Sequence, residues 1–63
     1  MRTEYTIKTT DNRGRVQFSV YPKKKCDEIF PKYKTWYEER GGKAEYFKVQ
    51  YNGAAFYKAE QIG

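Results

Sequence analysis

Hydrophobic and polar positions alternate along two stretches in the first third of the chain. Residues 3–9 place Tyr5 and Ile7 on one side, and residues 15–21 place Val16, Phe18 and Val20 on one side. A period of two in segments rich in β-branched and aromatic residues is typical of strands that bury one face. The pattern therefore predicts two β-strands.

Residues 11–14, Asp-Asn-Arg-Gly, separate these strands and form a turn sequence. Asp and Asn hydrogen-bond to their own backbone, and Gly adopts positive φ without steric cost. A four-residue loop predicts a hairpin that pairs Thr10 with Arg15, Ile7 with Phe18 and Tyr5 with Val20. The apolar faces of both strands coincide in this register.

The period changes to that of a helix between residues 22 and 40. Apolar side chains follow the i, i+3, i+4, i+7 spacing of one helical stripe, at Cys26, Ile29, Phe30, Tyr33, Trp36 and Tyr37. Pro22 suits a first turn, and Gly41-Gly42 suit a C-terminal stop. Pro31 removes a backbone hydrogen bond within this stretch. We therefore expect a short turn over residues 23–29 and a main helix over about 31–40.

Residues 43–51 and 54–62 flank Asn52-Gly53, a strong signal for a hairpin with a type I′ turn. A two-residue loop pairs Tyr51 with Ala54, Val49 with Phe56 and Phe47 with Lys58. The opposite face of this hairpin then carries Tyr46, Lys48, Gln50, Ala55, Tyr57 and Ala59.

These elements predict one α+β domain over residues 1–63, with the order β-hairpin, α-helix, β-hairpin. We expect a small antiparallel sheet with one helix packed on one face, because each element must bury its apolar side. The predicted core consists of Tyr5, Ile7, Val16, Phe18, Val20, Ile29, Phe30, Tyr33, Trp36, Phe47, Val49 and Phe56.

The charge distribution adds a functional signal. The chain has a net charge of +5, and residues 1–25 hold seven basic and two acidic side chains, whereas residues 26–63 hold six of each. All of the excess positive charge therefore lies in the first two-fifths of the sequence. Such asymmetry favours a polyanionic partner, although solubility alone is a competing explanation.

Several classes of chemistry are excluded by composition. The chain has no histidine and one cysteine, so Cys/His zinc sites, intramolecular disulfides and Ser-His or Cys-His pairs are impossible. The carboxylates of Asp27-Glu28 and Glu38-Glu39 are adjacent, and neighbours on a helix point in different directions. We expect no enzyme activity, no cofactor, no metal, no membrane span and no signal peptide, in a reduced, cytoplasmic setting.

Two sets of side chains are candidates for binding a partner. The first is basic, and the second is placed by the predicted register on the open face of the sheet. The basic set is Arg13, Arg15, Lys23, Lys24 and Lys25, and the open-face set is Lys48, Tyr46 and Tyr57. Three lysines at a helix start oppose the helix dipole, which favours a role in contacting phosphates. Solvated lysine stems and cross-strand Lys–Tyr pairs are the alternative explanation.

These features predict a small basic module that binds nucleic acid, either DNA or RNA. Lysine and arginine side chains would contact phosphates and exposed tyrosines would stack on bases. The alternative is a protein–protein interaction module, an adaptor or inhibitor that docks on an acidic protein surface, because tyrosine-rich surfaces suit protein interfaces equally well.

Overall fold

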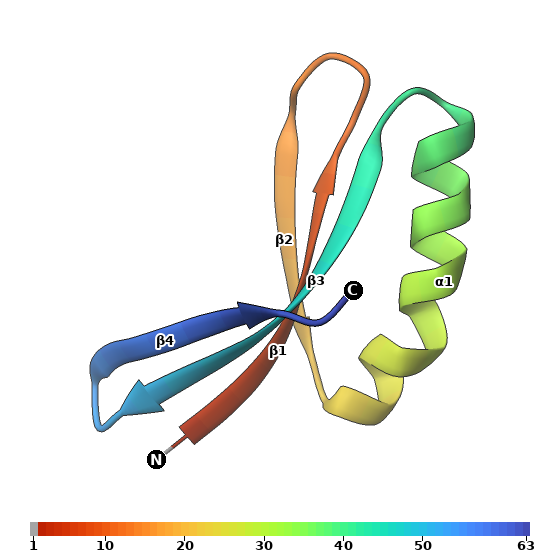
Figure 1. The fold of residues 1–63 in the computed structure, drawn as a ribbon. Helices are drawn as coiled ribbons and strands as arrows, with labels where there is room; N and C mark the ends of the chain where they lie inside the picture. The colour runs from red at the N-terminus through yellow and green to blue at the C-terminus, as the bar shows by residue number, and fades with distance from the viewer. Residues whose placement is uncertain (1) are drawn as a thin grey trace.

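One open antiparallel sheet of four strands carries a single helix across one of its faces (Figure 1). The computed structural model describes residues 2–63. Its elements are β1 (Arg2–Thr10), β2 (Val16–Tyr21), α1 (Lys23–Glu39), β3 (Lys43–Asn52) and β4 (Ala55–Gln61). The strands lie in the order β2-β1-β3-β4, so β1 and β3 are central. The predicted α+β fold of hairpin, helix and hairpin is confirmed.

The helix ends where the sequence predicts, in a Schellman motif built on the two glycines. Gly41 has a φ of 81°, its N–H donates to the Glu38 carbonyl, and the Gly42 N–H donates to the Tyr37 carbonyl at 2.7 Å. Gly42 is needed for a second reason, because a Cβ there would lie 2.3 Å from the Thr10 carbonyl oxygen. This close approach joins the end of α1 to the end of β1.

Pro31 lies inside α1, and the helix continues through it as one element of 17 residues. The expected division into a short turn and a main helix is therefore wrong. Pro31 costs the helix one backbone hydrogen bond. In Figure 1 the first turns of α1 lie at an angle to the remainder, so the chain bends near the proline and does not break.

The first hairpin has a register one residue away from the predicted one. Thr10 pairs with Val16, Lys8 with Phe18 and Thr6 with Val20. The loop is shorter than expected: the Asp11 N–H donates to the Arg15 carbonyl, and Gly14 adopts a φ of 83°. A three-residue loop with a left-handed glycine at its third position is a common hairpin type. One residue of shift moves every side chain of β2 to the other face.

The second hairpin also differs from its predicted register. Asn52 pairs with Ala55, and only Gly53 has positive φ, as in a type II′ turn whose central residues are Gly53 and Ala54. A β-bulge follows opposite Gln50 and Tyr51, so Val49 pairs with Ala59 and not with Phe56. The prediction of a type I′ turn with Asn52 and Gly53 at its centre is therefore wrong in both the type and the position of the turn.

These registers decide which side chains form the core. The buried cluster consists of Ile7, Cys26 and Tyr46, surrounded by Tyr5, Tyr21, Ile29, Phe30 and Tyr33. Five of the predicted core residues are instead exposed: Val16, Phe18, Val20, Trp36 and Phe56. Phe47 and Val49 are half-buried and line a hollow on the sheet face opposite the helix, together with Phe18 and Val20. The core prediction succeeded for β1 and for Ile29, Phe30 and Tyr33 of the helix, and it failed for Trp36 and for the other three strands.

Tyr46 connects the helix to the sheet. Its ring lies 5.3 Å from that of Phe30, and its hydroxyl donates a hydrogen bond of 2.9 Å to the Asp27 carboxylate. Asp27 also accepts from the Lys23 ammonium at 2.7 Å. These two donors, Lys23 first, lower the pKa of Asp27, while burial raises the pKa of Tyr46. A buried phenol is tolerated here because its hydroxyl has a partner.

Within residues 2–63, no helix has the length and apolar character needed to cross a membrane.

Candidate functional site

A groove runs between α1 and the edge strand β2, at the end of the molecule that holds the first hairpin loop. Two hollows of about 380 and 410 Å³ form it, and they share Trp36 and Tyr37. Its lining is aromatic, basic and polar: Thr9, Asp11, Asn12, Arg13, Arg15, Gln17, Ser19, Lys32, Tyr33, Trp36, Tyr37, Arg40 and Gly42. The groove exists because the shifted register turns the polar side of β2 toward the helix.

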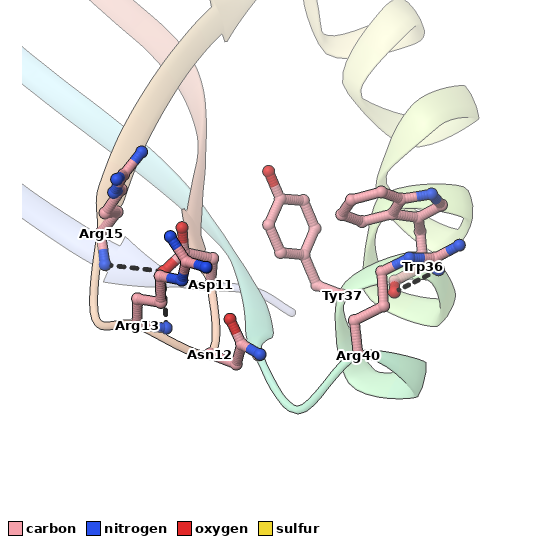
Figure 2. Close-up of a pocket in the computed structure, with 8 residues that line it drawn as sticks. Asp11, Asn12, Arg13, Arg15, Trp36, Tyr37 and Arg40 are labelled. Atoms are coloured by element: carbon pink, nitrogen blue, oxygen red, sulfur yellow. Dashed lines mark hydrogen bonds between the residues drawn. The ribbon is translucent and has the colours of Figure 1, made fainter.

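The hairpin loop holds two arginines at the mouth of this groove. The Asp11 carboxylate accepts from the backbone N–H of Arg13 at 2.8 Å and of Arg15 at 2.9 Å. These hydrogen bonds from backbone N–H groups, that of Arg15 first, lower the pKa of Asp11. The negative charge of Asp11 therefore stabilises the loop backbone. Both arginine side chains remain exposed on the loop side of the groove (Figure 2).

The helix supplies the opposite wall. The Arg40 guanidinium lies 4.0 Å from the centroid of the Trp36 ring and donates to the Trp36 carbonyl at 3.0 Å. Trp36 is nevertheless 51% exposed. Figure 2 shows Tyr37 between the loop arginines and the pair of Trp36 and Arg40. A planar cation stacked on an indole, both open to solvent, is a surface suited to flat ligands.

The electrostatics of the groove favour an anion. Four of its lining residues are basic (Arg13, Arg15, Lys32 and Arg40), and one, Asp11, is acidic. Glu39 lies just outside, with a carboxylate oxygen 3.9 Å from the Arg40 guanidinium. Desolvation and the neighbouring Tyr21 raise the pKa of Tyr33, so this phenol adds no negative charge at neutral pH.

The predicted site residues are divided between separate parts of the molecule. Arg13 and Arg15 lie together in the groove, whereas Lys23, Lys24 and Lys25 form the first turn of α1. A helix of 17 residues spans about 25 Å at about 1.5 Å per residue, so the lysines lie far from the two arginines. The basic residues of the first two-fifths of the chain therefore do not form one patch.

The lysines at the helix start are partly engaged within the chain. Lys23 forms an ion pair with Asp27, which raises the pKa of Lys23, and the Lys25 ammonium lies 4.6 Å from the Tyr21 ring centroid. Lys24 has no such partner among the described residues. The ion pair with Asp27 and the contact with the Tyr21 ring offset part of the unfavourable interaction between these lysines and the positive end of the helix dipole.

The predicted open-face residues also separate. Tyr46 is only 5% exposed and belongs to the core, so its assignment to the outer face is wrong. Lys48 pairs with Tyr5 and Glu60, on the face that carries the helix. Tyr57 is 56% exposed at the bulge of β4, with the Lys58 ammonium 5.9 Å from its ring centroid. The structure does not bring these three side chains together.

Sequence reasoning missed the helix side of the groove. The spacing of the apolar stripe, with Tyr33 at i+7 and Trp36 at i+10 from Cys26, predicts a core position for Trp36. In the structure Tyr37 is half-buried whereas Trp36 is exposed, so Trp36 lies at the edge of the apolar stripe and not in the core. The signal that distinguishes them is Arg40, four residues after Trp36, because a cation at i+4 places a charged group over the same face of the helix.

The described residues contain no group of three or more cysteine, aspartate or glutamate side chains that could hold a metal ion. No protein-family model, no curated protein and no solved structure matches this chain. The groove and the exposed surfaces of the fold are therefore the features that indicate a function.

Proposed function

We propose that this chain binds single-stranded nucleic acid in the groove between α1 and β2. The observation that carries the proposal is the half-exposed Trp36, stacked by Arg40 and facing two loop arginines across Tyr37. Nonspecific single-strand binders combine aromatic rings that stack on bases with a positively charged groove that follows the backbone. Here Trp36 and Tyr37 supply the rings, and Arg13, Arg15 and Arg40 supply the charge.

Polar side chains along β2 suit contacts to base edges. Gln17 and Ser19 line the groove opposite the aromatic residues of α1, and Asn12 lies at its mouth. Amide and hydroxyl groups both donate and accept hydrogen bonds, so they tolerate several bases. Stacking on Trp36 and Tyr37 requires bases whose faces are free, so the groove suits a single strand better than a duplex.

Titration of a labelled oligonucleotide tests the proposal directly. Trp36 is the only tryptophan of the chain, so quenching of its fluorescence reports on the groove itself. We expect single-stranded DNA and RNA to bind more tightly than duplex of the same length at low salt. Trp36→Ala is expected to weaken binding by about 1–3 kcal/mol, the usual effect of removing one stacking ring.

Two matched controls separate the groove from general attraction. Arg13→Gln with Arg15→Gln is expected to lower the salt slope by about 1.4, because each phosphate contact on a single strand contributes about 0.7. Lys24→Gln with Lys25→Gln removes the same charge at the other end of α1 and is expected to change the slope less. Tyr57→Ala removes a ring as exposed as Trp36 and leaves affinity unchanged.

Several results would contradict the groove. Equal losses for the arginine and lysine pairs would show that charge acts without a defined site. Equal losses for Trp36→Ala and Tyr57→Ala would show that stacking is not confined to the groove. The absence of binding to any nucleic acid at low salt would reject the function and favour the alternative, docking on an acidic protein surface.

A further inference from the structure

The face of the sheet opposite the helix carries a cluster of exposed and half-buried apolar side chains. They come from three strands, and the largest are Phe18, Val20, Phe47, Val49, Tyr51 and Phe56. Phe18 is 66% exposed. Exposed apolar patches of this extent on a soluble domain mark interaction surfaces. No element of residues 2–63 covers this face (Figure 1).

The apolar side chains form the two walls of a shallow hollow whose floor is polar. The hollow has a volume of about 450 Å³. Phe18 and Val20 of β2 form one wall, and the other wall comes from β3 and β4. The floor is β1, which presents Glu4, Thr6 and Lys8 in succession. A partner that fits this face must therefore present apolar side chains to the two walls and charges opposite to those of Glu4 and Lys8 to the floor.

The charges on the floor are arranged so that the face complements itself. Glu4 and Lys8 lie on either side of Thr6, each about 7 Å away at about 3.4 Å per residue. A twofold axis that lies between two such faces, parallel to the sheets and roughly perpendicular to β1 at the level of Thr6, places Lys8 of one copy over Glu4 of the other, twice. A twofold interface requires this kind of self-complementarity, in which residue i meets j and j meets i.

We propose that the open sheet face binds a second copy of this chain, in a face-to-face dimer whose twofold axis lies between the two sheets and crosses β1 at the level of Thr6. Two twisted sheets pack at about −30° with about 10 Å between them, which lets aromatic side chains from both inner faces interdigitate. Phe18 and Phe47 then become buried, and both Glu4–Lys8 pairs are formed across the interface.

The size of the face is sufficient for such a dimer. A standard protein interface buries about 800 Å² on each partner. The Cα atoms extend 38 and 23 Å in the two longer directions, so one broad face of the molecule supplies that area. A second copy is also favoured over nucleic acid on this face, because Glu4 and Glu45 place negative charge among Arg2 and Lys8.

Lys8 already has an acidic neighbour within its own chain. It pairs across the strands with Glu45, whose Oε1 is buried without a hydrogen-bond partner and lies 3.6 Å from the Lys43 ammonium. The dimer adds the partner's Glu4 on the other side of Lys8. The groove on the helix side is not involved, so the dimer and the proposed nucleic-acid site are tested separately.

Sedimentation equilibrium of charge-reversal variants tests the proposal. We expect the wild-type chain to dimerise reversibly. Glu4→Lys alone and Lys8→Glu alone are each expected to raise the dimer Kd by about tenfold or more, because both create two like-charge pairs. An equimolar mixture of these two variants restores opposite charges at both pairs, and we expect it to form a heterodimer. Restored association also shows that both variants fold.

Glu60→Lys is the matched control, because it makes the same charge change on β4, where Glu60 pairs with Lys48 on the other face. It is expected to leave the dimer Kd unchanged. A wild-type chain that is monomeric at millimolar concentration would overturn the proposal. Single variants that dimerise like the wild type, or a mixture that fails to associate, would reject the twofold arrangement.

Discussion

The two faces of the sheet use different side chains. The covered face buries Ile7 and Tyr46 under Cys26 of the helix, and it also buries a polar residue, Thr9. The open face carries Phe18 and Val20, which are more hydrophobic than the tyrosine buried on the other side. Burial in this protein therefore follows strand register and the position of the single helix, and it does not follow hydrophobicity residue by residue.

This difference shows how a short chain builds a core with one helix. An aromatic residue with a polar end can be buried if its hydroxyl has a partner, and Tyr46 finds one in Asp27. One helix covers only one face of a four-stranded sheet, and even there β2 lies partly beyond it. The remaining apolar side chains stay on the open face, where another molecule can cover them.

The largest expected effect is a difference in the free energy of unfolding between substitutions on the two faces of the sheet. Ile7→Ala deletes a fully buried side chain and is expected to lower the free energy of unfolding by about 2–5 kcal/mol. Val20→Ala deletes an exposed one and is expected to cost less than about 1 kcal/mol in the monomer. Urea unfolding followed by circular dichroism at low protein concentration measures both. Equal losses would mean that the monomer covers its open face.

A smaller effect is expected from removing one hydroxyl on each face. Tyr46→Phe removes the donor to Asp27 and is expected to cost about 0.5–1.5 kcal/mol, the usual net value of one hydrogen bond. Tyr51→Phe on the open face is the matched control, and its hydroxyl forms no side-chain hydrogen bond within the described residues. A null result for Tyr46→Phe would show that water replaces the bond to Asp27.

The smallest effect is a dependence of stability on pH. The pKa of Asp27 is lowered in the folded state, chiefly by Lys23 and then by Tyr46, below its ordinary value of 3.8. A lowered folded-state pKa stabilises the fold at neutral pH, and this contribution is lost as the pH falls past the ordinary value and through the lower folded-state pKa. Asp11 contributes with the same sign.

Asp27→Asn is therefore expected to lower Tm at pH 7 and to flatten the decline of Tm with acid. Asp27→Asn combined with Asp11→Asn should flatten it further, because the two carboxylates lie at opposite ends of the molecule and act independently. A profile as steep as that of the wild type in the double variant would assign the acid sensitivity to other carboxylates.

The element order could be predicted from the sequence because its signals are local. Alternation in β1 and β2, the stripe of α1 and the Gly41-Gly42 stop each depend on a few neighbouring residues. Both registers were wrong because each depends on one turn residue: Gly14 closes a shorter loop than four residues, and Gly53 begins a type II′ turn. Strands with apolar side chains on both faces give no second signal that corrects such an error.

Only the residues of the candidate site with a local signal in the sequence could be predicted. Arg13 and Arg15 stood out through the charge asymmetry, and the structure places both in the groove. Trp36 and Arg40 were missed, because their role depends on how α1 is rotated against the sheet. That rotation is set by Tyr46, Phe30 and Cys26 in the core, whose contacts are not local in the sequence.

The buried thiol of Cys26 allows the opening of α1 to be measured by chemical labelling. The sulfur is fully covered, within 3.6 Å of the Tyr5 and Tyr21 carbonyl oxygens, and burial raises its pKa. Since it is the only thiol, a modifying reagent can react only when the start of α1 lifts from the sheet. The labelling rate of the unmodified protein therefore measures how often the helix opens, without any engineered probe.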